Sequence, residues 1–179
     1  MGPHRLASDI ALAQQAARGD RAAAGELARR AAPVVADLLR RMGAQPALAD
    51  DLTQDALIAA LKAVATYRGE APFAGWVMRI AARLYLKRFR KDARTQVTDR
   101  PLGEETPDPA AVDGGARLDL DRALGKLSRP ERLCVSLCHG AGLTQAEIAQ
   151  ALQVPLGTVK SHVTRGLAKL RALLGAADG

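Results

Sequence analysis

The chain has 179 residues, of which 48% are hydrophobic and 3% aromatic, with a formal net charge of +7 and a pI of about 10.0. This length fits one large domain or two small ones, and the charge favours a polyanionic partner, either nucleic acid or an anionic membrane surface. No apolar run approaches the length of a membrane span, and residues 1–15 lack the apolar core and cleavage site of a signal peptide. We therefore expect a cytoplasmic protein with no direct membrane insertion.

The first half of the chain is predicted to be helical throughout. Ala and Leu dominate it, apolar residues recur at helical spacing, and β-branched alternation is absent. Ser8 and Asp20 are the expected N-caps of the first two helices, Gly19 and Gly43 the expected ends, and Pro46 the first turn of the third helix. The predicted spans are 9–18, 21–42, about 46–66, and 73 to about 94.

The third predicted helix combines an apolar stripe with an acidic first half. The stripe consists of Leu48, Leu52, Ala56, Ala59 and Ala63, and the acidic part of Asp50, Asp51, Gln54 and Asp55. Such an acidic face could pair with basic groups of a partner. Taken alone, it is more typical of an ordinary exposed helix face.

All five aromatic residues lie between positions 67 and 89, next to a loop that Gly and Pro predict for 67–72. They are Tyr67, Phe73, Trp76, Tyr85 and Phe89, and they alternate with Arg68, Arg79, Arg83, Lys87 and Arg88. Rings stack on unpaired bases and cations hold phosphates, so this segment suits single-stranded nucleic acid. The alternative is a small aromatic core with a solvated basic edge.

A change of composition follows the fourth predicted helix. Residues 95–117 carry Pro, Gly and five acids without apolar periodicity, which predicts a flexible acidic linker. We therefore predict an all-α protein of two small helical domains, residues 1–94 and 118–179.

The C-terminal domain is predicted to contain a helix-turn-helix. After short helices before and after Ser128, Thr144 and Glu147 form a capping-box pattern, residues 153–157 form a turn, and a last helix runs to about Leu174. Its outward face is basic and hydroxyl-bearing, which suits the DNA major groove; a plain helical hairpin is the alternative. This face carries Thr158, Lys160, Ser161, His162 and Arg165.

Nothing in the sequence indicates an enzyme or a cofactor. Cys134 and Cys138 lie four residues apart beside His139, but no second ligand cluster accompanies them, so we expect no zinc site. Neighbouring positions 138 and 139 point to different faces of a helix, which argues against a thiolate–imidazole pair. There is no pair of catalytic carboxylates and no phosphate-binding Gly loop.

Two stretches together resemble the extracytoplasmic-function (group IV) sigma factors of bacterial RNA polymerase. Residues 50–91 include the pattern YRGEAPFAGW and the triplet RIA, and residues 143–174 include VPLGTVKS. The resemblance implies a protein that binds core polymerase and directs promoter-specific transcription initiation. A conventional helix-turn-helix regulator is the alternative, but it has no need of the aromatic–basic segment.

The resemblance also implies roles for particular residues. The positions that would bind core polymerase are Asp51, Gln54 and Asp55. Those that would melt and capture minus-10 DNA are Tyr67, Arg68, Phe73, Trp76, Arg79, Arg83 and Lys87, and those that would read the minus-35 duplex are Thr158, Lys160, Ser161, His162 and Arg165. An anti-sigma factor, commonly membrane-anchored in this family, is the implied regulator.

The chain departs from the family pattern at two of these positions. Arg83 stands where Asn is frequent, and Arg prefers guanine or phosphate, so the captured base is expected to differ. His162 stands where Arg is common, which predicts a weaker phosphate contact at neutral pH.

Overall fold

The structure is a computed structural model that describes residues 3–95 and 115–175. Within these residues every regular element is helical, which confirms the predicted all-α class. They form two compact units, the first made of residues up to 40 and 44–88, the second of the remainder. Most of the predicted linker lies outside the described residues, so the domain boundaries proposed from the sequence stay predictions.

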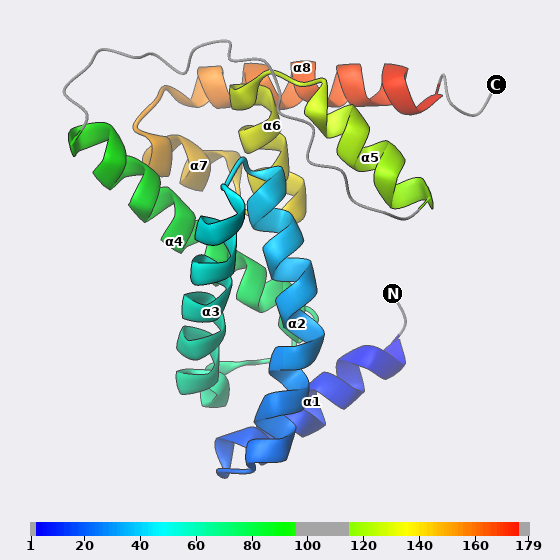
Figure 1. The fold of residues 1–179 in the computed structure, drawn as a ribbon, viewed down its shortest axis with the longest axis vertical. Coiled ribbons are helices and arrows are strands. Elements are labelled where there is room, and N and C mark those ends of the chain that lie inside the picture. The colour runs from blue at the N-terminus through cyan, green and yellow to red at the C-terminus, as the bar shows by residue number, and fades with distance from the viewer. Residues whose placement is uncertain (1–2, 96–114, 176–179) are drawn as a thin grey trace. The chain divides into compact units, whose positions relative to one another are not determined.

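The first half of the chain forms four α-helices and one 3-10 turn (Figure 1). In chain order these are α1 (Pro3–Ala17), α2 (Arg21–Arg41), α3 (Pro46–Lys62), the 3-10 turn η1 (Val64–Thr66) and α4 (Phe73–Thr95). The loop predicted for 67–72 connects η1 to α4.

Several helix ends follow local chemistry. Asp20 caps α2, since its Oδ1 accepts the N–H groups of Ala22 and Ala23 at 2.8 and 3.1 Å. Gly43 has φ +96°, which is typical of a residue just past a helix end. The predicted cap at Ser8 is wrong: α1 already begins at Pro3, and the Ser8 hydroxyl accepts a hydrogen bond from Arg30 of α2 at 3.1 Å.

The core of the first unit is built mainly from small and aliphatic side chains, together with the buried rings of Phe73 and Tyr85. On α3 the buried face is rotated from the predicted stripe, because Leu48, Ala59 and Ala63 are only half-buried. The Thr53 hydroxyl donates a hydrogen bond to the Ala49 carbonyl oxygen at 2.7 Å, so this polar group can be buried. The buried residues of α3 are Ala49, Leu52, Thr53, Ala56 and Ala60.

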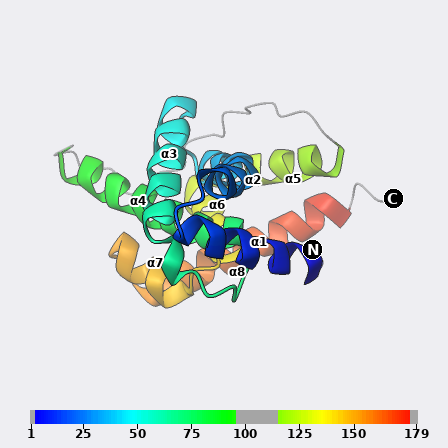
Figure 2. The same cartoon turned by 90° about the horizontal axis from the view of Figure 1, so that it is seen from below.

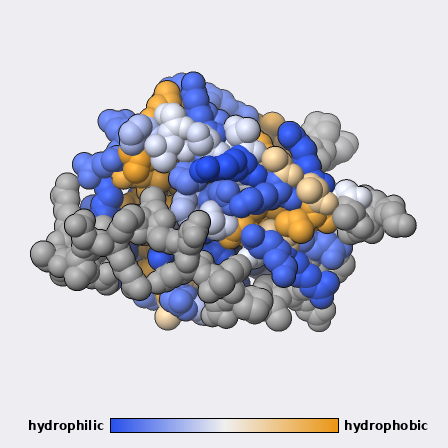
Figure 3. Space-filling model, turned by 90° about the horizontal axis from the view of Figure 1, so that it is seen from above, coloured by the Kyte–Doolittle hydropathy of each residue, from blue (hydrophilic) through white to orange (hydrophobic). Residues whose placement is uncertain are grey.

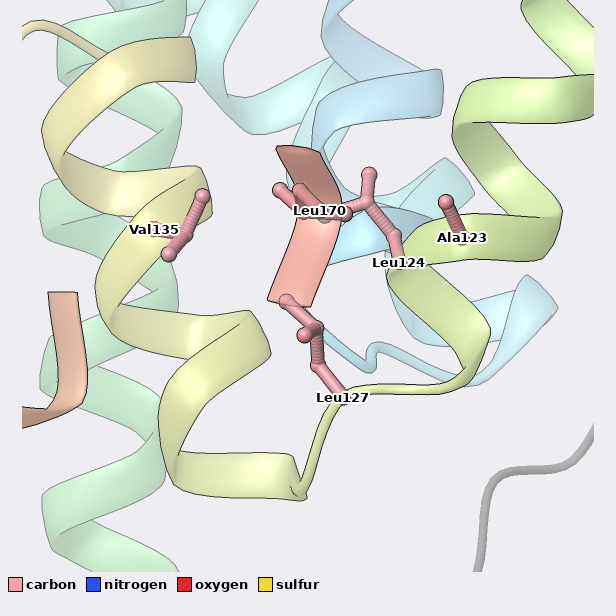
Figure 4. Close-up of a cluster of buried hydrophobic side chains, with 5 residues drawn as sticks. All are labelled: Ala123, Leu124, Leu127, Val135 and Leu170. Carbon is pink, nitrogen blue, oxygen red and sulfur yellow. The ribbon is translucent and has the colours of Figure 1, made fainter. Parts of the chain in front are cut away.

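The second half of the chain forms α5 (Gly115–Gly125), α6 (Arg129–Val135), the π-helical turn η2 (Ser136–Gly140), α7 (Gln145–Leu152) and α8 (Leu156–Gly175). The long helix α8 packs against α5, α6 and α7. Figure 4 shows the cluster that joins three of these helices: Ala123, Leu124, Leu127, Val135 and Leu170. The π-helical turn has no counterpart in the sequence prediction, which continued a regular helix.

Helices α6 and α8 approach closely at Gly166, which is buried. A Cβ atom on this residue would lie 2.7 Å from Cγ2 of Val135 and 3.5 Å from Cβ of Glu131. Since Val135 belongs to the core cluster, it has little room to yield. The packing of α8 therefore requires glycine here.

We predict that Gly166→Ala destabilises the protein by about 1–3 kcal/mol, the usual cost of an extra methyl group in a packed interior. Gly157→Ala on the same helix is the control, because a Cβ there meets nothing within 4 Å. Urea denaturation followed by far-UV circular dichroism compares the two variants. Equal stability of both would show that α6 and α8 are not tightly packed at this point.

Candidate nucleic-acid interface and polymerase-binding face

Three aromatic rings form a cluster where the 67–72 loop meets α4. The ring centroid of Tyr67 lies 5.5 Å from those of both Phe73 and Trp76, and Phe73 lies 5.6 Å from Trp76. Phe73 is only 1% exposed, whereas Tyr67 and Trp76 are half-buried. Phe73 therefore supports the cluster from below in this conformation, and only the other two rings present surface to which a base could stack.

The Tyr67 side chain also shapes the loop. Its hydroxyl donates to the carbonyl oxygen of Ala71 at 2.6 Å, which closes residues 67–71 into a compact turn. Burial and the negative charge of Asp9 raise the pKa of Tyr67 to about 12. The phenol is therefore neutral at physiological pH and keeps the proton that this hydrogen bond needs.

Three cations extend the cluster along α4. Arg79, Arg83 and Lys87, here called the basic stripe, recur every four residues and lie on one face of the helix. Arg83 and Lys87 are exposed and Arg79 is half-buried, while Arg68 is exposed in the loop. Of the residues predicted for minus-10 DNA, the three rings are in mutual contact, and the cations lie in the adjoining loop and along α4.

The predicted helix-turn-helix is present. The capping box at the start of α7 has both hydrogen bonds: Glu147 N–H to Thr144 Oγ1 at 3.2 Å and Thr144 N–H to Glu147 Oε2 at 2.8 Å. Gln153 ends α7 in the left-handed conformation with φ 57°. Apolar side chains lie between the two helices: Ile148, Ala149, Val159 and Val163 are buried, whereas Leu152 and Leu167 are half-buried.

The outward face of α8 carries the residues predicted to read the minus-35 duplex. Lys160, Ser161 and Arg165 are exposed, and Thr158 and His162 are half-buried. Arg165 Nη2 lies 3.2 Å from Nδ1 of His162. Burial and the positive charge of Arg165 lower the pKa of His162 despite the opposing charge of Glu131, so its imidazole is neutral at neutral pH.

A residue that the sequence analysis missed holds α8 in place. Glu131 is buried at 4% exposure, and both its oxygens accept from Lys169 Nζ, at 2.8 and 3.0 Å. It also accepts the Ser128 N–H at 3.1 Å and lies 3.9 Å from Arg165 Nε. Burial alone would raise the pKa of Glu131, but Lys169 and the Ser128 amide outweigh it and lower that pKa. The spacing of Ser128 and Glu131 is typical of a capping box at the start of α6. No local sequence pattern indicates that Glu131 also pairs with Lys169 of α8.

A surface groove of about 580 Å³ separates α2 from α3. Its lining combines apolar side chains with polar and charged ones. The apolar ones include Ala36, Leu57, Ile58 and Leu61, and the others are Asp37, Arg40, Asp50, Thr53 and Gln54. The three residues predicted to bind core polymerase are Asp51, Gln54 and Asp55, all exposed on α3. Exposed acids beside a groove lined partly by apolar side chains are suited to a partner with basic and apolar side chains.

Among the coloured residues of the face drawn in Figure 3, hydrophilic side chains are interspersed with small hydrophobic patches. Among residues 3–95 and 115–175, no helix combines the length and apolar composition needed to cross a bilayer. The same residues contain no group of three potential metal ligands.

The two cysteines are poor nucleophiles at neutral pH. Burial raises the pKa of the Cys134 thiol to about 11 and also raises the pKa of the Cys138 thiol.

Two protein-family models match this chain, one in its first half and one in its second. Sigma-70 region 2 matches residues 27–95, which include the aromatic cluster, and Sigma-70 region 4 matches residues 123–172, which include the helix-turn-helix. The RNA polymerase sigma factor NccH of Alcaligenes xylosoxydans is 33% identical over 93% of this chain and 94% of its own length. The chain belongs to the ECF sigma factors of bacterial RNA polymerase.

Other relatives agree with this assignment. The ECF sigma factor SigE of Mycolicibacterium smegmatis is 36% identical over 88% of this chain, which spans 65% of SigE. CnrH of Cupriavidus metallidurans is 32% identical over 94% of the chain. A solved structure of CnrH in complex with the cytosolic domain of CnrY matches with a TM-score of 0.52, at 31% identity, over 94% of this chain and 98% of that one.

The sigma factor directs RNA polymerase to promoters and is not an enzyme. The match of region 2 to residues 27–95 decides against a conventional helix-turn-helix regulator, because that alternative explained only the C-terminal unit.

We predict a pH-dependent difference in stability between the wild type and Glu131→Gln. Because the pKa of Glu131 is lowered, its ionised form stabilises the fold above the ordinary value of 4.5, and this contribution is lost as pH falls through the lower folded value. The wild type should therefore be more stable than the variant near neutral pH, and this difference in stability should shrink in acid. Thermal melts of both proteins across this range measure the difference, and a gap that does not change with pH would contradict the assignment.

Proposed function

We propose that the two units of this sigma factor divide promoter recognition between the aromatic cluster and α8. The observation that carries the proposal is the half-buried Tyr67–Trp76 pair beside the basic stripe of Arg79, Arg83 and Lys87. Stacking of bases on these rings and phosphate contacts along the stripe would offset the cost of separating strands, a few kcal/mol per flipped base. The loop 67–72 with Arg68 would hold the captured minus-10 base.

The second part of the proposal places α8 in the major groove of the minus-35 element. Lys160, Ser161 and Arg165 face outward on the first half of the helix, as base and phosphate contacts require. Thr158 and the neutral His162 supply hydrogen bonds without charge. Arg165 lies 3.2 Å from His162 Nδ1, and its Nε lies 3.9 Å from Glu131, so its guanidinium has local partners before DNA binds.

The third part assigns α3 to core polymerase. Asp51, Gln54 and Asp55 form an exposed acidic face beside the α2–α3 groove, and the apolar side chains that line the groove offer contact area for a partner helix. We infer further that the protein acts in the cytoplasm and is held inactive by an anti-sigma factor. The complex of CnrH with the cytosolic domain of CnrY supports this inference by similarity.

The direct test is transcription of sheared genomic DNA by purified core polymerase, with and without the protein, followed by mapping of the RNA 5′ ends. We expect discrete start sites that appear only with the protein and share elements near minus 35 and minus 10. Start sites identical to those of core polymerase alone would refute the proposed function.

We predict that Asp51→Lys together with Asp55→Lys abolishes core binding in a pull-down assay and leaves the fold intact, because both side chains are exposed. Asp119→Lys on α5 is the control, since this acid is also exposed but lies outside the proposed face. Normal core binding by the double variant would exclude α3 as the contact.

We predict that Lys160→Ala and Arg165→Ala each weaken binding to the mapped upstream element, by about 1–3 kcal/mol for a residue with a paired base contact. Arg171→Ala, an exposed arginine further along α8, is the matched control. Quantitative footprinting over a range of salt concentrations separates base from phosphate contacts, because a lost phosphate contact lowers the salt slope. Unchanged footprints for both test variants would exclude α8 as the reader.

We predict that Trp76→Ala forms closed complexes normally and opens duplex promoter poorly, while Trp76→Phe retains most opening because it keeps a ring for stacking. Permanganate reactivity at a mapped promoter measures opening, and a thermal melt shows that each variant is folded. Normal opening by folded Trp76→Ala would mean that the cluster serves only as core.

A further inference from the structure

Helix α1 has no role in the functions described so far. It lies before residues 27–95, which match region 2, and it carries none of the site residues. Yet α1 packs against η1, immediately before the loop 67–72, and it lies beside this part of the chain in Figure 2. Three contacts connect α1 or its charge to the start, middle and end of the loop.

The first contact is a hydrogen bond that caps α4 from a distance of 64 residues. Asp9 Oδ2 accepts the backbone N–H of Phe73 at 3.0 Å, and both residues are buried. Phe73 is the first residue of α4, so its N–H has no acceptor within the helix. A carboxylate also interacts favourably with the positive end of the helix dipole. Asp9 therefore fixes the point at which the loop becomes helix.

The second contact is the close packing of Ile10 on the loop backbone. A Cβ atom on Gly69 would lie 2.6 Å from Cδ1 and 2.7 Å from Cγ1 of Ile10. Gly69 also has φ +71°, which side chains disfavour. The loop thus lies directly against α1, and glycine is required both by conformation and by space.

The third connection is electrostatic: after burial, the negative charge of Asp9 contributes to the raised pKa of Tyr67 at the start of the loop. Asp9 is itself held on its other side, where Arg30 Nη1 of α2 lies 3.6 Å from Oδ1. Arg30 also donates to Ser8 and to Glu26. The Asp9 carboxylate therefore pairs with α2 on one side and caps α4 on the other.

From these contacts we infer that Asp9 and Ile10 are positioning residues for capture of unpaired minus-10 DNA. Neither touches DNA in this scheme. They hold the loop and the first turn of α4 in the conformation that presents Tyr67 and Trp76, so that the loop need not be ordered when the strand binds. This inference rests on the proposed function of the loop.

The test uses the full-length protein and its only tryptophan, Trp76, as a reporter of the loop. In Asp9→Ala we expect Trp76 emission to shift to longer wavelength and acrylamide quenching to increase, without DNA present. Asp9→Asn, which keeps an acceptor for the Phe73 N–H, should stay close to wild type. Asp20→Ala is the matched control, since it removes another helix cap of the same unit that does not contact the loop.

A second pair of variants covers the case in which Asp9→Ala fails to fold. Gly69→Ala should alter Trp76 emission, and Ile10→Ala in the same chain should restore part of it by removing the clash, although the strain of positive φ persists. If Ile10→Ala restores nothing, or if folded Asp9→Ala matches Asp20→Ala, α1 does not position the loop.

The functional arm measures binding of holoenzyme to a fluorescent single strand that carries the mapped minus-10 sequence. Asp9→Ala should weaken this binding about two- to tenfold, the range expected for one lost hydrogen bond, and should leave binding to the minus-35 duplex unchanged. Altered Trp76 emission with unchanged strand binding would overturn the inference. If wild-type holoenzyme shows no preference for the strand, the proposed function fails, and the emission measurements still decide whether α1 holds the loop.

Discussion

The carboxylate of Glu131 is buried, and the packing of the second unit depends on the groups around it. A buried charge is costly unless it is both paired and hydrogen-bonded. Here Lys169 of α8 and the Ser128 amide meet these requirements. Asp9 is the counterpart in the first unit: it is equally buried, caps α4 and pairs with Arg30 of α2. In both units one anionic side chain caps one helix and binds a cation from another, so the relation between these helices is set by charge as well as by apolar area.

The two surfaces that we propose to contact DNA are extensions of these packed elements. On α4, Phe73 and Tyr85 are buried while Trp76 is half-buried and Arg83 and Lys87 are exposed. A single helix therefore supplies core on one side and the basic stripe on the other. On α8 the same division holds, with Val159 and Val163 against α7 and Lys160 and Arg165 outside. Rigid helices of this kind keep recognition side chains in register with little entropy lost on binding.

Signals from near neighbours in the chain predicted most element ends correctly. The caps at Asp20 and Thr144 and the glycine after α2 involve partners within a few residues, so the sequence contains the whole interaction. The same logic failed at Ser8, where the local capping signal competes with a helix that already begins at Pro3. It also missed the π-helical turn after Val135, since no short motif marks a change from one helical hydrogen-bond pattern to another.

The sequence by itself determined the all-α class, the helix-turn-helix and the concentration of rings and cations between residues 67 and 89, because periodicity, composition and capping are local properties. The tertiary structure alone decided which of these side chains face outward. It placed Phe73 under the cluster, brought Glu131 to Lys169 across 38 residues, and brought Asp9 to the start of α4 across 64. Contacts between residues so far apart depend on how helices pack, and burial is a property of the assembled core. A single sequence records neither of them directly.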